Sequence, residues 1–177
     1  MNIAVITGSP HRHGTSALLA DEFIRGAMEV GHKVYRFDAA FEEIHACQGC
    51  DRCGMGSHPC VWQDSMTKLN PELLKADGVV LVTPLYYFGF SAQIKTIIDS
   101  FYANSYSFTG GKRAALLATA WDANKWTMEA LTAHYHTLTR YMHWQDSGMV
   151  LAVGCGTRND IERSPFPTQA YQFGQRF

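Results

Sequence analysis

Four of the five cysteines lie within fourteen residues of one another, at Cys47, Cys50, Cys53 and Cys60. Their spacing is C-x2-C-x2-C-x6-C. In a reducing compartment such a cluster indicates redox chemistry or metal binding rather than structural disulfides. Thiolates at this spacing can hold a [4Fe–4S] cluster, because each iron needs one protein sulfur, and zinc also accepts four thiolates. Bare reduced thiols are the third interpretation, and spacing leaves all three open.

A second group with chemical potential is the loop Gly8–Ser16, which lies between an apolar run and a predicted helix. Its end, Gly14-Thr15-Ser16, places two hydroxyls beside free backbone N–H groups, which suits a dianionic phosphate. Five residues separate Gly8 from Gly14 and Thr15 stands where a Walker A loop needs Lys, so that class is excluded. The dinucleotide pattern G-x-G-x-x-G is also absent. We expect a phosphate that is held and not transferred; an ordinary serine-rich cap is the alternative.

A third stretch follows the predicted strand Val79–Thr83 and has four aromatic residues in five positions, Tyr86, Tyr87, Phe88 and Phe90. Rings at the end of a strand are costly to expose and can flank a flat conjugated ring. Pro84 and Gly89 shape the backbone so that its amides can approach a ligand. Packing into the core or against a dimer partner is the alternative. A phosphate at the first loop and a tricyclic ring at this one together indicate FMN.

These stretches are placed by alternating strands and helices. The predicted strands are Ile3–Thr7, His32–Phe37, Val79–Thr83, Arg113–Thr119 and Gly148–Val153. The predicted helices are Thr15–Val30, Asp64–Ala76 with an interruption at Asn70-Pro71, one capped by Ser91, Trp126–Trp144, and a last helix from about Pro167. This alternation predicts an α/β fold with a parallel sheet. Ligands bind such sheets at the carboxyl ends of the strands, which groups Gly8–Ser16, Pro84–Phe90 and Ala120–Asn124 at one edge.

The whole-chain properties are those of a soluble globular protein. The 177 residues are 46% hydrophobic and 18% charged, which predicts one domain, 1–177, with a substantial core. A net charge of -1 gives no reason to expect nucleic acid or a membrane surface as partner. The first strand begins at Asn2 without a leader, and no apolar run reaches the length of a membrane span. We therefore expect a cytoplasmic protein.

Taken together, the motifs resemble a known family. They are Gly8-Ser9-Pro10…Gly14-Thr15-Ser16, the run Ala46–Cys60 with its four cysteines, the run Thr83–Asp99, and the ending Ala170-Tyr-Gln-Phe-Gly174. In this order they resemble the flavodoxin-like NAD(P)H-dependent FMN reductase and iron–sulfur flavoprotein group. The resemblance implies a flavodoxin-like three-layer αβα sandwich with a five-stranded parallel sheet of order 2-1-3-4-5. It also implies non-covalent FMN and a homodimer or homotetramer.

The resemblance also implies the cofactor-binding residues, position by position. Ser9, His11, Arg12, Thr15 and Ser16 are expected at the phosphate. Pro84, Leu85, Tyr86, Tyr87, Phe88 and Gly89 are expected along the ring system, and Thr119, Trp121 and Asp122 on its pyrimidine side. The run His11-Arg12-His13 departs from the family pattern, which has Arg or Lys among small polar residues, although Arg12 can still reach a phosphate.

The implied reaction passes hydride from a reduced nicotinamide, NAD(P)H, to FMN and on to a quinone, flavin or similar acceptor. It needs no side-chain nucleophile or base, because flavin supplies the chemistry, and we expect no catalytic residue. An iron–sulfur flavoprotein that carries electrons through a cluster on Cys47, Cys50, Cys53 and Cys60 is the first alternative. A non-catalytic metal-binding or redox-sensing module is the second.

Overall fold

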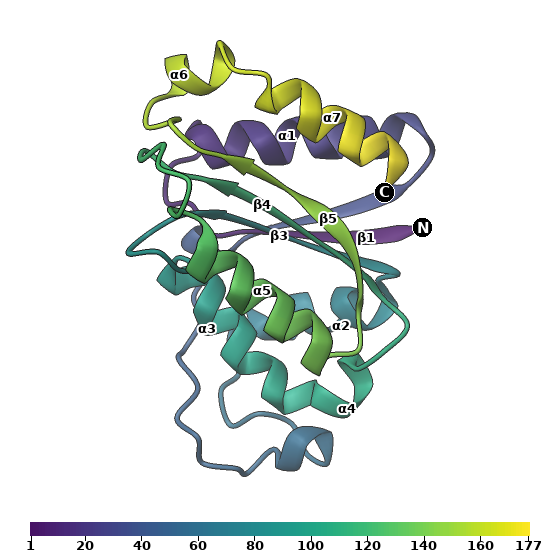
Figure 1. The fold of residues 1–177 in the computed structure, drawn as a ribbon. Coiled ribbons are helices and arrows are strands. Elements are labelled where there is room, and N and C mark those ends of the chain that lie inside the picture. The colour runs from purple at the N-terminus through teal and green to yellow at the C-terminus, as the bar shows by residue number, and fades with distance from the viewer.

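In the computed structural model, which describes all of residues 1–177, a five-stranded parallel sheet runs through the centre of the molecule (Figure 1). The strands lie in the order β2-β1-β3-β4-β5 and every neighbouring pair is parallel. Their bounds are β1 Asn2–Thr7, β2 Lys33–Asp38, β3 Gly78–Pro84, β4 Arg113–Thr119 and β5 Gln145–Ala152. The predicted flavodoxin-like fold and strand order are therefore confirmed.

Helices cover both faces of this sheet. Helices α1 (Thr15–Glu29), α6 (Arg158–Glu162) and α7 (Phe166–Arg176) lie on one face (Figure 1). On the other face lie α2 (Met66–Lys75), α3 (Ala92–Ser100), α4 (Ser105–Phe108) and α5 (Glu129–Tyr141). Short 3-10 turns are formed by Ala39–Phe41, Gly54–Gly56 and Phe101–Asn104. None of the helices has the length and hydropathy needed to span a lipid bilayer.

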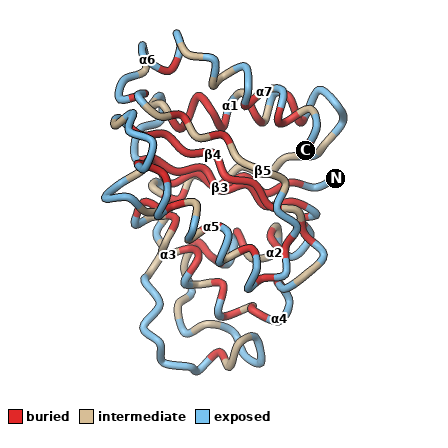
Figure 2. Tube along the Cα trace, viewed as in Figure 1, coloured by how far each residue is buried: buried red, intermediate tan, exposed pale blue.

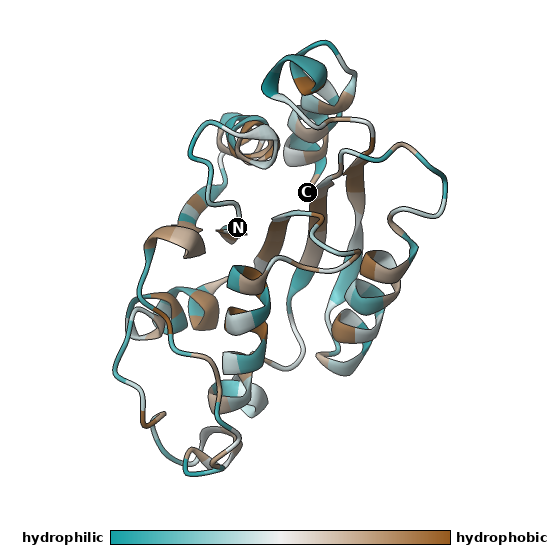
Figure 3. Cartoon of the chain, turned by 90° about the vertical axis from the view of Figure 1, so that its left-hand side faces the viewer, coloured by the Kyte–Doolittle hydropathy of each residue, from teal (hydrophilic) through white to brown (hydrophobic).

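The two helix layers explain the nearly continuous apolar sequences of the inner strands. Figure 2 shows β3 and β4 as the most deeply buried part of the chain, and all seven residues of β3 are buried. Val79 and Leu81 point into the core under α3 and α5, whereas Val80 and Val82 point into the core under α1 and α7. Side chains alternate between two buried faces, so no position along the strand needs to be polar. Figure 3 shows these hydrophobic strands between the helix layers.

Several predicted helix limits were wrong. Helix α2 continues through Pro71 without a break, because the fully buried Leu69 and Leu73 hold it to the sheet on both sides of the proline. Helix α5 is shorter than the predicted range Trp126–Trp144, since His143 has a φ of 52° and turns the chain directly into β5. Helix α6 was not predicted. It begins with a capping box in which Thr157 and Asp160 bond each other's backbone.

Helices α1 and α7 cross so closely that two glycines are required at the contact. A Cβ atom on Gly174 would lie 2.1 Å from the carbonyl oxygen of Phe23, and one on Gly26 would lie 2.1 Å from that of Tyr171. No real Cβ contact is this short, so a larger residue would have to push the two helix backbones apart. The same contact buries Phe173 beside Phe23, in an edge-to-face pair with 5.7 Å between ring centroids.

We therefore expect Gly174→Ala to lower the free energy of unfolding by about 2–3 kcal/mol, as overpacking of a close contact does. Gly89→Ala is the matched control, because a Cβ there meets no atom within 4 Å. Urea unfolding followed by circular dichroism measures both variants. Equal stability of the two would show that α7 can shift away from α1 at no cost.

Candidate functional site

The carboxyl edge of the sheet brings together the three loops expected to form a site. The parallel hydrogen-bond ladder continues into the start of each loop, through Gly8 N to Val82 O (2.9 Å), Leu85 N to Thr119 O (2.7 Å) and Ala120 N to Ala152 O (2.9 Å). Each loop therefore departs from a fixed point beside its neighbour. This arrangement follows from the parallel sheet, since all its strands end on the same side.

Gly8 and Ser91 lock the first two loops together. The Ser91 hydroxyl donates to the carbonyl oxygen of Gly8 at 3.1 Å, and the Ser91 N–H donates to the hydroxyl of Thr83 at 3.0 Å. A Cβ on Gly8 would lie 2.3 Å from the Ser91 hydroxyl oxygen, so only glycine fits there. Ser91 stands at the N-terminus of α3, but its side chain does not cap that helix as predicted, because the hydroxyl is used by Gly8.

The N-terminus of α1 is open, as an anion site requires. The first-turn N–H groups of an α-helix have no intrahelical partner, and in α1 no side chain at the N-cap Gly14 satisfies them. The hydroxyls expected at the phosphate also join α1 to the end of β4. Thr15 donates to the Thr119 hydroxyl at 3.1 Å, and the hydroxyls of Ser16 and Thr119 are 2.8 Å apart. Ser16 is buried, so in this structure it is a tie between elements.

Beside this helix end, on the β2 side, lies a cavity of about 290 Å³ lined by residues that include Ser9, His11 and Arg12. The Arg12 guanidinium lies 3.6 Å from the ring centroid of Phe41 and has no carboxylate partner. In contrast, Arg36 in the same cavity bonds both Asp38 and Asp21. Burial acts to lower the pKa of Arg36, but these hydrogen bonds outweigh it and raise the pKa. Arg12 is therefore the arginine in this cavity that can serve an incoming anion.

The aromatic loop forms a tight turn with an unusual backbone. Tyr87 and Phe88 have φ angles of 44° and 63°, and the Gly89 N–H donates to the Tyr86 carbonyl at 3.2 Å. Two successive positive φ values define a type I′ turn, which normally contains Asn and Gly. The turn leaves Tyr87 fully exposed and Phe88 and Tyr86 half-exposed. Phe90, by contrast, is part of the core.

The loop Ala120–Asn124, the third at this edge, is braced by Asp122, one of the predicted site residues. The Asp122 carboxylate accepts hydrogen bonds from the Asn124 backbone N–H at 2.9 Å and from its side chain at 2.6 Å, which lower the pKa of Asp122. This carboxylate therefore shapes the loop. Trp121 is 85% exposed and lies against the backbone of Gly156, where a Cβ would come within 2.2 Å of the indole.

Trp126 was not predicted as a site residue, because it was assigned to a long helix. It lies instead in the turn before α5, half-exposed, with its ring centroid 5.2 Å from that of Phe88. Its position two residues after the loop Ala120–Asn124 was the available signal.

The four clustered cysteines lie in a separate region, the segment 45–64 between β2 and α2, here called the Cys loop. It extends away from the sheet beside α3 and α4 (Figure 1). All four cysteines line one cavity of about 390 Å³, together with residues of α3 and of Phe101–Asn104. Cys53 is buried, Cys60 is half-buried, and Cys47 and Cys50 are exposed, with no disulfide among them. No three His, Cys, Asp or Glu side chains converge as metal ligands in this arrangement.

The tip of the Cys loop is tightly wound. Five residues between 49 and 56 have positive φ angles, namely Gly49, Asp51, Gly54, Met55 and Gly56. The carbonyl of Cys53 accepts hydrogen bonds from the N–H groups of both Gly56 and His58 at 3.0 Å. Tyr102 holds this tip to the helical layer by donating its hydroxyl to Asp51 at 2.6 Å, and this bond raises the Tyr102 pKa to about 12.

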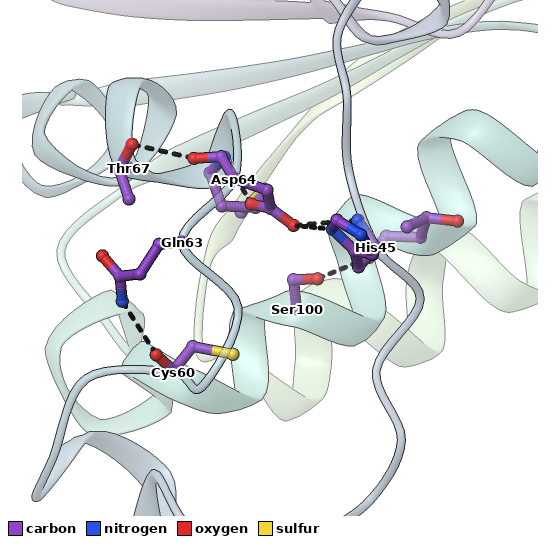
Figure 4. A network of polar contacts seen from close by, with 8 residues as sticks. His45, Cys60, Gln63, Asp64, Thr67 and Ser100 are labelled. Carbon is purple, nitrogen blue, oxygen red and sulfur yellow. Dashed lines mark hydrogen bonds and ion pairs between the residues drawn. The ribbon is translucent and has the colours of Figure 1, made fainter.

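The two ends of the Cys loop are joined by a buried carboxylate, as Figure 4 shows. Asp64 accepts hydrogen bonds from the backbone N–H groups of His45 at 2.8 Å and Met66 at 2.9 Å, and it lies 3.3 Å from the His45 ring. The His45 ring stacks on Trp62, with 4.1 Å between centroids. Because the Asp64 side chain is only 3% exposed, these bonds are protected from water.

We expect Asp64→Ala to leave two backbone N–H groups near the Cys loop unpaired, costing roughly 1–3 kcal/mol. The loop should then open more often, and the buried Cys53 should react faster with a thiol reagent under native conditions. Mass spectrometry of alkylated peptides measures this rate. Asp160→Ala, which disturbs a capping carboxylate on α6, is the control and should leave Cys53 as protected as in the wild type.

Comparison with known proteins shows the family of this chain. The model of the NADPH-dependent FMN reductase family matches residues 1–156. An iron–sulfur flavoprotein of Archaeoglobus fulgidus is 35% identical over 123 residues, covering 68% of this chain and 62% of the relative. One from Methanosarcina thermophila is 31% identical over 103 residues, covering 56% and 51%. The chain spans about half the length of the curated relatives it matches.

Among solved structures, an NAD(P)H:quinone oxidoreductase from Methanothermobacter marburgensis superposes with a TM-score of 0.81 at 15% identity, covering 99% of this chain and 95% of that one. At this identity the likeness shows the shared fold alone. The family model spans most of the chain and matches the sequence directly, as the motif resemblance predicted. The chain belongs to the NADPH-dependent FMN reductase family.

Proposed function

We propose that this chain binds FMN at the carboxyl edge of its sheet and is an NAD(P)H-dependent oxidoreductase that reduces a quinone, a flavin or a similar acceptor. One observation carries the proposal: an uncapped helix N-terminus and an exposed, strained aromatic turn lie at the same edge of the sheet. The first suits a phosphate and the second a flat ring. We also propose that the protein is cytoplasmic and acts as a homodimer or homotetramer.

The residues present fit this cofactor. The first-turn N–H groups of α1 and the unpaired Arg12 would hold the phosphate, with Ser9 and His11 beside them. The Pro84–Gly89 turn would line the ring on one side, and Trp121 would lie on the side of the third loop. FMN supplies the hydride-accepting chemistry when it is bound, and the protein binds and orients it.

The side chains at this edge are suited to positioning and to excluding water rather than to proton transfer. The Asp122 carboxylate is occupied by Asn124, and the hydroxyls of Thr15, Ser16 and Thr119 bond one another. The exposed rings of Tyr87 and Trp121 can cover a flat ligand and keep water from it. This arrangement agrees with a mechanism that uses no catalytic side chain.

Arg12 provides a test of the phosphate site. We expect Arg12→Gln to weaken FMN binding about tenfold, because a charge-assisted contact to the phosphate is lost. Riboflavin lacks the phosphate, so its affinity should not change. Flavin fluorescence titration measures both ligands, and Arg52→Gln on the Cys loop is the matched control. An equal loss for FMN and riboflavin would place the phosphate elsewhere.

Anaerobic mixing of the FMN-loaded protein with NADPH or NADH tests the reaction itself. We expect the absorbance of oxidised flavin to disappear with at least one of the two, because hydride transfer reduces the ring. Subsequent addition of a quinone should restore the oxidised spectrum. Flavin that stays oxidised with both nicotinamides would contradict the proposed enzyme and favour a binding or sensing module.

A second candidate function is electron transfer through an iron–sulfur cluster. It is favoured by four thiols that line one cavity and by a Cys loop whose successive positive φ angles are typical of backbone that binds anionic groups. The curated relatives named above are called iron–sulfur flavoproteins. The thiols are not gathered as ligands in this structure, so the Cys loop would have to close around a cluster.

Anaerobic purification with iron and sulfide analysis tests this candidate. A [4Fe–4S] protein should contain about four irons and four sulfides per chain. Cys53→Ser should lose them, whereas Cys155→Ser, at a buried position outside the Cys loop, should keep them. Zinc without sulfide would indicate a tetrathiolate zinc site, and neither metal would indicate free thiols.

A further inference from the structure

We propose that Trp126 and Phe88 form an aromatic platform on which a planar electron acceptor stacks, and that this platform determines acceptor specificity. The proposal rests on the proposed flavin-dependent function and names the residues that select its acceptor. The two rings come from different loops, one after β3 and one after β4, and meet with 5.2 Å between centroids at an angle of 39°. About half of each residue stays accessible, at 42% for Phe88 and 52% for Trp126.

The backbone at Phe88 suggests that this exposure is useful. A non-glycine residue with a φ of 63° is strained, and Tyr87 before it, with a φ of 44°, is strained as well. Asn-Gly would form the same turn without strain. Two aromatic residues at these positions therefore carry a cost in stability. Such strain is typical of residues that contact ligands.

Trp126 is held in place on the other side of the platform. The Thr127 N–H donates to the carbonyl of Asn124 at 3.1 Å, and Asn124 is itself fixed by Asp122. Met128, which follows Thr127, is buried in the core. Trp126 therefore projects from a braced turn and not from a loose loop. A rigid, half-exposed pair of rings favours flat aromatic ligands, because stacking needs a surface that is already in place.

The test compares Trp126→Ala and Trp126→Phe with the control Tyr141→Ala, an exposed aromatic residue at the far end of α5. We expect Trp126→Ala to raise the KM for a naphthoquinone about tenfold and to leave turnover of ferricyanide, which has no flat ring, unchanged. Trp126→Phe should have a KM for the naphthoquinone close to that of the wild type. Equilibrium dialysis of the naphthoquinone against the oxidised, FMN-loaded protein should show the same loss of binding without any turnover.

A second variant, Phe88→Asn, separates specificity from folding. Asn adopts positive φ readily, so the thermal midpoint should not fall, while the KM for the naphthoquinone should rise as it does for Trp126→Ala. The proposal is overturned if Trp126→Ala and Tyr141→Ala have the same KM for the naphthoquinone, or if Trp126→Ala lowers the turnover of ferricyanide as much as that of the naphthoquinone. It is also overturned if Trp126→Ala weakens the binding of FMN, or if Phe88→Asn lowers the thermal midpoint. If the wild-type protein binds no FMN, the proposed function itself fails. If it binds FMN and reduces the naphthoquinone but the Trp126 variants behave like the control, only the aromatic platform fails.

Discussion

The hydrogen bond from Gly8 N to Val82 O extends the pairing of β1 and β3 beyond the last residue of β1. It fixes where the loop Gly8–Ser16 begins relative to the aromatic loop Pro84–Phe90, and the other contacts at this edge depend on that placement. Because the carbonyl of the same Gly8 accepts from Ser91, the start of α3 is fixed too. A site that needs two loops at a constant separation can thus be built on a sheet whose strands differ in length.

At the same edge, hydroxyl groups that are predicted to bind the phosphate also join two elements of the fold. The Thr119 hydroxyl accepts a hydrogen bond from Thr15 and shares another with Ser16, and so links α1 to β4. A helix held by these bonds keeps its first-turn N–H groups in a constant direction. Binding of an anion would then depend on backbone groups and on Arg12, whose side chain lies over Phe41.

Much of this molecule could be predicted from its sequence. Hydrophobic periodicity located all five strands, and their alternation with helices predicted a parallel sheet. The order of the strands was predicted from the resemblance of the motifs to a known family. Helix ends were less predictable. Pro71 did not break α2, since burial of Leu69 and Leu73 outweighed a local preference that short-range rules treat as decisive.

The contacts across the site could not be predicted, because they depend on side-chain directions that only the folded chain determines. The sequence indicated that the residues at 86–88 would face a ligand, but the φ angles of Tyr87 and Phe88 decide which ring is free and which meets Trp126. The four cysteines were recognised by spacing, yet spacing carries no information on how far Cys47 and Cys50 stand from Cys53 in space. In the structure the first two are exposed and the third is buried.

The hydrogen bonds that Asp64 accepts make the Cys loop a unit separate from the rest of the fold. The Cys loop is closed at its base by hydrogen bonds from Asp64 to His45 and Met66, and its tip is anchored to Tyr102. None of these contacts involves the residues at the carboxyl edge. The Cys loop and the loops at the carboxyl edge are therefore held by separate sets of hydrogen bonds, so a change in the length or the cysteines of the Cys loop leaves the contacts of that edge in place.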